Sequence, residues 1–68
     1  MSLPVATIER VIKSAGVPRV AGSATNVIIA QAESYITDLA KKSYAYAKHA
    51  GRNTLKDTDV KAALGLVD

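Results

Sequence analysis

The chain has 68 residues, of which 49% are hydrophobic and 22% charged, and its net charge is +3. This length allows one domain, spanning residues 1–68, and so short a domain is marginally stable without a disulfide, a metal or a partner chain. With no Cys and one His, the sequence excludes disulfides and thiolate metal sites and is too poor in ligands for zinc. We therefore expect no metal, no cofactor and a second polypeptide as the stabilising partner.

Hydrophobic segments of the chain are too short to cross a membrane. The longest in its middle is VIIA at 27–30, against roughly 20 apolar residues for a membrane-spanning helix. The start, MSLPVATIER, lacks the basic and apolar parts of a signal peptide. We expect a cytoplasmic protein with no membrane partner.

Residues 4–15 predict a short amphipathic helix. Apolar residues recur there at spacings of three and four: Val5, Ile8, Val11, Ile12 and Ala15. Ser2 is a candidate N-cap, and Gly16 stands where a left-handed C-cap favours glycine. Arg10 and Lys13, three residues apart, share the polar face.

The segment GVPRVAG at 16–22 predicts a loop with Arg19 at its centre, because Pro18 and two glycines break the helical pattern. Residues 23–50 then predict one long helix, with an apolar or small residue recurring along its whole length and Gly51 as its C-cap.

A final helix is predicted at 57–66, after a short extended link at 52–55. Asp57 and Asp59 fall in its first turn, where acidic side chains suit the helix dipole. Gly65 is expected to fray its end.

The length of the central helix argues for a dimer. A helix of 27 residues is about 40 Å long, whereas a compact monomer of this size has a diameter of roughly 28 Å. Two short helices cannot cover an apolar stripe of that length. A second copy crossing the first would cover it, so we expect a homodimer.

Two stretches of the chain resemble the signatures of a known family. LPVATIERVIKSAGVPRV at 3–20 and AKHAGRNTLKDTDVKAA at 47–63 resemble the signature stretches of archaeal histones. The loop GVPRV and the run TLKDTDV also resemble eukaryotic core histones. The order of a short, a long and a short helix is that of the all-α histone fold, so the chain is identified as a member of the archaeal histone family.

This resemblance implies a handshake homodimer whose long helices cross antiparallel, so that the first loop of one chain lies beside the second loop of the other. The positive charge is gathered in two places, with a net +2 in residues 1–22 and +2 in residues 48–61. The handshake would join these places into one surface suited to the phosphates of duplex DNA. The residues that the resemblance assigns to DNA binding are Arg10, Lys13, Arg19, Arg52, Asn53, Thr54 and Lys56.

Individual roles also follow from the resemblance. Arg19 would enter the minor groove without reading bases, while Asn53 replaces the usual Lys or Arg and removes one charge. Arg52 and Asp59 would form a structural clamp between the second loop and the last helix.

The resemblance further implies contacts between dimers. His49 would face Asp59 of the next dimer, while Tyr46 and Ala62 replace bulky aliphatic residues and weaken the tetramer or longer polymer. Gly16 would let successive turns of a DNA-wrapped fibre stack closely, although the C-cap alone also explains a glycine there.

Three functions remain open from the sequence. The first is an archaeal-type histone, located on the chromosome or nucleoid, that wraps and compacts double-stranded DNA with little sequence preference. The second is a histone-fold protein that forms a heterodimer with a paralogue in a transcription-related complex. The third, an enzyme using His49, Asp57 and Asp59, is disfavoured because the chain offers no activated nucleophile and no room for a small-molecule substrate.

Overall fold

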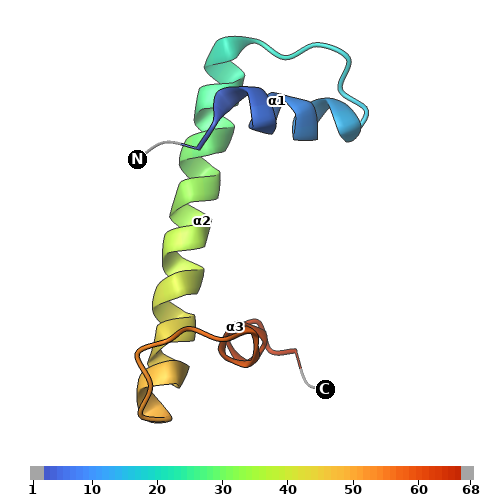
Figure 1. Ribbon diagram of the computed structural model, residues 1–68. Helices are drawn as coiled ribbons and strands as arrows, with labels where there is room; N and C mark the ends of the chain where they lie inside the picture. The colour runs from blue at the N-terminus through green and yellow to red at the C-terminus, as the bar shows by residue number, and fades with distance from the viewer. Residues whose placement is uncertain (1–2, 67–68) are drawn as a thin grey trace. The chain divides into compact units, whose positions relative to one another are not determined.

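The computed structural model describes residues 3–66 and contains three helices in chain order, α1 (Val5–Ser14), α2 (Gly22–His49) and α3 (Asp57–Ala63) (Figure 1). No strand occurs within residues 3–66, which confirms the all-α prediction. The chain forms two compact units, Met1–Ser34 and Tyr35–Asp68. The first unit holds α1 and the beginning of α2, and the second holds the rest of α2 together with α3.

In the first unit, α1 is one residue shorter at each end than predicted. Pro4 is its N-cap, with an extended backbone and a carbonyl that accepts the N–H of Ile8 at 3.1 Å. Ser2, the expected cap, lies outside the described residues. Ile8 and Ile12 are half-buried and four residues apart, so they form the face of α1 that packs inward in this unit.

The helix α2 begins at Gly22, one residue before the predicted start. The carbonyl of Ala21 accepts the N–H of Thr25 at 3.1 Å, so neither Gly22 nor Ser23 caps the helix as expected. The first described turn of α2 thus starts from the end of the loop that carries Arg19.

Two pairs of residues on α2 are buried within their units. Thr25 and Ile29 are buried in the first unit, and Ser43 and Ala47 in the second, each pair four residues apart. The hydroxyls donate to carbonyls one turn earlier, from Thr25 to Ala21 at 3.3 Å and from Ser43 to Leu39 at 2.6 Å. Because each hydroxyl is satisfied within the helix, burial leaves no unpaired polar group at these positions.

Much of the predicted apolar stripe of α2 is not covered by its own chain. In the first unit Val27 is 63% exposed and Ile28 is also exposed, while in the second Tyr35 is 60% exposed beside an exposed Ile36. The prediction omitted the buried Ile29, because the sequence alone does not tell which apolar face the short helices cover.

The helices α2 and α3 both end in a left-handed glycine. Gly51 has φ +75°, its N–H donates to the carbonyl of Lys48 and the following N–H donates to that of Ala47, each at 2.9 Å. Gly65 has the same φ, with donation from Leu66 to Lys61 at 2.8 Å. This paired pattern is the Schellman motif, and at Gly65 it ends α3 at Ala63, three residues before the predicted end.

Candidate nucleic-acid interface

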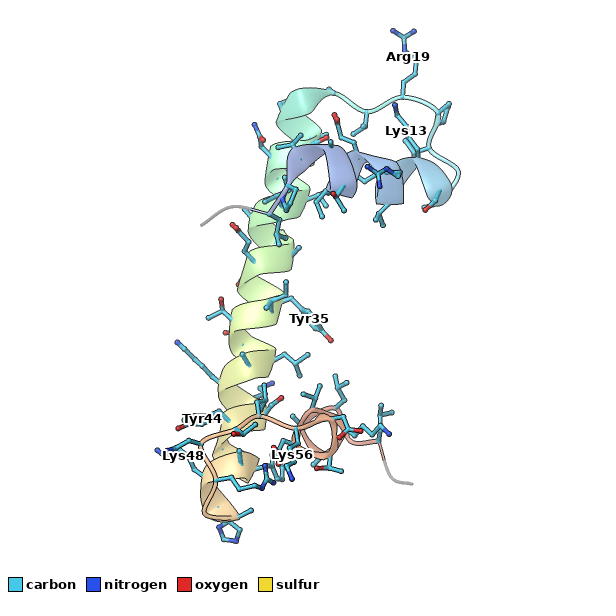
Figure 2. The ribbon with its side chains drawn as sticks, viewed as in Figure 1. Lys13, Arg19, Tyr35, Tyr44, Lys48 and Lys56 are labelled. Carbon is cyan, nitrogen blue, oxygen red and sulfur yellow. The ribbon has the colours of Figure 1, made fainter. Side chains whose placement is uncertain are left out.

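Three basic side chains of the first unit are exposed. Arg10 and Lys13 lie on α1, and their spacing of three places them on one face of that helix. Arg19 lies in the loop between α1 and α2, and Figure 2 shows its side chain pointing away from the ribbon. All three are therefore accessible to an anionic partner.

In the second unit, Arg52 and Asp59 form a bidentate ion pair. Nη1 of Arg52 donates to Oδ2 of Asp59 and Nη2 donates to Oδ1, both at 2.9 Å. Nη1 also donates to the backbone carbonyl of Thr54 at 3.0 Å. One guanidinium thus connects the end of α2, the loop and the first turn of α3.

The backbone N–H of Lys56 is a further donor to Asp59. It donates to Oδ2 at 2.9 Å, so the carboxylate also satisfies the N-cap residue of α3. Asp59 is only 4% exposed. The pair is therefore partly shielded from water, and its planar geometry fixes the conformation of the loop.

These hydrogen bonds determine the pKa of the Asp59 carboxyl. Donation from Arg52, followed by donation from the backbone of Lys56, lowers this pKa from 3.8 to about 2, because both favour the charged form. The same bonding to Asp59 raises the pKa of Arg52. Asp59 is accordingly ionised and paired at neutral pH.

Three other loop residues are exposed around the ion pair: Asn53, Thr54 and Lys56. The hydroxyl of Tyr44 donates to Oδ1 of Asn53 over 3.4 Å, and Nζ of Lys48 lies 5.8 Å from the centre of the Tyr44 ring. The sequence analysis missed Tyr44 and Lys48, although their spacing of four on a helix indicates that they are neighbours.

The residues expected to join two dimers lie on both helices of the second unit. Tyr46 and His49 are exposed near the end of α2, where they line a shallow pocket with Ala45. Ala62 is half-buried on α3, whereas Asp59 is buried and already paired with Arg52. In the first unit, Gly16 has φ +99°, and a Cβ there would meet nothing within 4 Å.

Other kinds of site were also considered. Within residues 3–66, no group of three His, Cys, Asp or Glu side chains is placed to hold a metal ion. None of the helices in that same range is long and apolar enough to span a bilayer.

Residues 1–64 match the family of histone-like transcription factors (CBF/NF-Y) and archaeal histones. The chain belongs to this histone family. It is similar to one of the subunits of archaeal histone HAN1 from Thermococcus zilligii, at 40% identity over 62 residues covering 91% of this chain and 92% of the relative. It is also similar to probable archaeal histone 3 of Methanocaldococcus jannaschii, at 45% identity over 62 residues with the same coverage.

These similarities confirm the resemblance and the all-α histone fold. They also confirm the interpretation of the chain as an archaeal-type histone, a DNA-binding protein of chromatin. Histone-fold proteins bind DNA and form dimers, and they are structural proteins rather than enzymes.

Proposed function

We propose that this histone binds, wraps and compacts double-stranded DNA as a homodimer, with little reading of base sequence. The observation that carries the proposal is the exposure of basic side chains around both loops, Arg19 in the first and Lys56 in the second. Cations on a rigid scaffold attract phosphates whatever the sequence, and the energetic preference then lies in how easily the DNA bends.

The homodimer is supported by the apolar side chains that each unit leaves uncovered. Among residues 3–66, the buried hydrophobic side chains are only Ile29 and Ala47. Val27 and Tyr35 are each exposed by 60% or more. A second copy that covers these side chains would supply the apolar burial that a 68-residue chain lacks on its own.

A handshake pairing would bring the two groups of cations together. Arg19 of one chain would lie beside Thr54 and Lys56 of its partner, with Arg10 and Lys13 of both chains between the paired loops. Such a dimer carries twice the +3 of one chain. A positive track of this kind neutralises successive phosphates and favours bending of DNA around the protein.

Each cation has a distinct proposed role on DNA. Arg19 inserts into the minor groove, where narrow A·T-rich segments have a strongly negative potential. Arg10, Lys13 and Lys56 neutralise phosphates, and the hydroxyl and backbone N–H of Thr54 donate to a phosphate. Arg52 acts chiefly as a clamp with Asp59, because its guanidinium donors are already used within the chain.

Dimers are proposed to assemble further along DNA. The contact would use Tyr46 and His49 of one dimer against Asp59 and Ala62 of the next, and Gly16 would let adjacent turns of the fibre approach. Ala62 supplies little apolar area, so the contact is weak without DNA. Ala62→Leu should raise the fraction of tetramer in sedimentation velocity, and an unchanged fraction would argue against this contact.

A second candidate is a heterodimer with a paralogue. It is favoured by one observation, that the relative at 40% identity is named as one of the subunits of HAN1. In that case the chain purified alone would aggregate or remain unfolded. A stable homodimer would favour the first proposal, which places the protein on the chromosome within the cytoplasm.

The proposed function is tested by binding and nuclease digestion of duplex DNA with the purified protein. We expect affinity to fall steeply with salt, with little difference between unrelated sequences. Micrococcal nuclease should then leave protected fragments in regular steps, one for each added dimer. Salt-independent binding would contradict the electrostatic interface, and a featureless smear would contradict wrapping.

A further inference from the structure

We propose that Tyr44, Lys48 and Asn53 form an additional phosphate contact beside the second loop, in which Tyr44 positions the amide of Asn53. We call these three residues the Tyr44 patch. The inference rests on the proposed DNA binding, but it assigns a site that the two groups of loop cations do not include.

The three side chains come from two elements of the second unit. Tyr44 and Lys48 are one turn apart on α2, and Figure 2 shows both on the same side of the helix. Asn53 follows the Gly51 turn that ends α2, and its Oδ1 lies 3.4 Å from the Tyr44 hydroxyl. All three side chains are exposed.

The hydrogen bond determines which end of the amide remains available. The Asn53 Oδ1 accepts from Tyr44, so the two N–H groups of Nδ2 are free of that bond. A phosphate oxygen is an acceptor only, and an amide N–H is a suitable donor to it. Tyr44 therefore holds Asn53 in the orientation that suits phosphate, in place of a charged side chain.

Lys48 supplies the charge that Asn53 lacks. Its Nζ lies 5.8 Å from the Tyr44 ring centre, within the range of a cation–π interaction. The aromatic ring restrains a flexible side chain that is otherwise free to move in solvent. The patch thus combines one restrained cation with one oriented neutral donor.

The salt dependence of DNA affinity separates these two kinds of contact. Removing a cation lowers both affinity and the slope of log K against log salt, by about 0.9 for each phosphate. Removing a neutral donor lowers affinity without changing the slope. We therefore expect Lys48→Gln to reduce the slope, and Tyr44→Phe and Asn53→Ala to weaken binding about two- to tenfold at constant slope.

A double-mutant cycle tests whether Tyr44 acts through Asn53. The variant carrying both Tyr44→Phe and Asn53→Ala should bind no more weakly than Asn53→Ala alone, since the hydroxyl has nothing left to orient. In an Asn53→Lys background, Tyr44→Phe should leave affinity unchanged, because an ammonium group needs no such orientation. Tyr35→Phe is the matched control, another exposed tyrosine of α2.

The outcomes distinguish this inference from the proposed function. If wild-type binding depends steeply on salt while all three substitutions bind like wild type, the Tyr44 patch is wrong and the proposed function stands. Additive effects in the cycle would overturn the positioning role of Tyr44. If the wild-type protein shows no salt-dependent binding, the proposed function itself fails. Circular dichroism melts of each variant exclude loss of fold as the cause.

Discussion

Arg52 and Asp59 face each other through two parallel hydrogen bonds of 2.9 Å, across the loop that joins α2 to α3. The same guanidinium binds the carbonyl of Thr54, and the same carboxylate binds the N–H of Lys56. Both of these loop residues are proposed to bind DNA. The ion pair therefore connects the stability of the second unit to the geometry of the DNA-binding loop.

Asp59→Asn should lower the thermal midpoint of unfolding, because it removes the charged partner of Arg52 and keeps the side-chain shape. Asp57→Asn is the matched control, since both residues lie in the first turn of α3 but Asp57 is exposed. The two substitutions remove the same charge near the helix N-terminus, so their difference isolates the ion pair. Equal midpoints for the two variants would mean that the pair contributes nothing.

The pH dependence of stability should follow the Asp59 carboxyl. Its pKa in the folded protein is about 2, below the ordinary 3.8, so its ionised form stabilises the fold. This contribution is fully present above pH 4 and is lost as the pH falls toward about 2. The difference in thermal midpoint between wild type and Asp59→Asn should therefore shrink across that range. A difference that grows on acidification would contradict the sign of the shift.

Arg19→Ala should weaken DNA binding for all sequences alike and leave the thermal midpoint unchanged, because the side chain is exposed and reads no bases. The salt slope should fall by about 0.9 for each phosphate that is no longer neutralised. Lys41→Ala removes the same charge from an exposed position on α2 and serves as the control. Equal effects of the two substitutions would show that only net charge matters.

Gly51→Ala should destabilise the fold by about 1 kcal/mol, because the backbone there has φ +75°, which disfavours a side chain. Gly22→Ala is the control, at the start of α2. An added Cβ meets nothing within 4 Å at either position, so the comparison isolates backbone conformation. The Gly22 variant should be as stable as wild type or slightly more so. Denaturant unfolding measures both.

The sequence predicted the helices well where local signals are strong. Pro4 and Gly16 place α1 within one residue at each end, and Gly51 marks the end of α2. The end of α3 was placed three residues too late, because apolar Leu66 continued the pattern beyond Gly65. Only the backbone shows that Leu66 donates back to Lys61 and so closes the helix.

Contacts that cross a turn were harder to predict. The pairing of Arg52 with Asp59 came from the family resemblance, and the additional bond from the backbone of Lys56 has no signature in residue spacing. The Tyr44–Lys48 pair was open to prediction from its spacing of four, whereas the bond from Tyr44 to Asn53 depends on how Gly51 redirects the chain.

The central claim is that two copies of this histone interlock, and that their pairing assembles the DNA-binding surface. Sedimentation equilibrium of the purified protein at micromolar concentration tests it most directly. The account predicts a helical, cooperatively melting species with the mass of two chains of 7.1 kDa. A well-folded species with the mass of one chain would contradict it, since the exposed Val27 and Tyr35 would then have no partner to cover them.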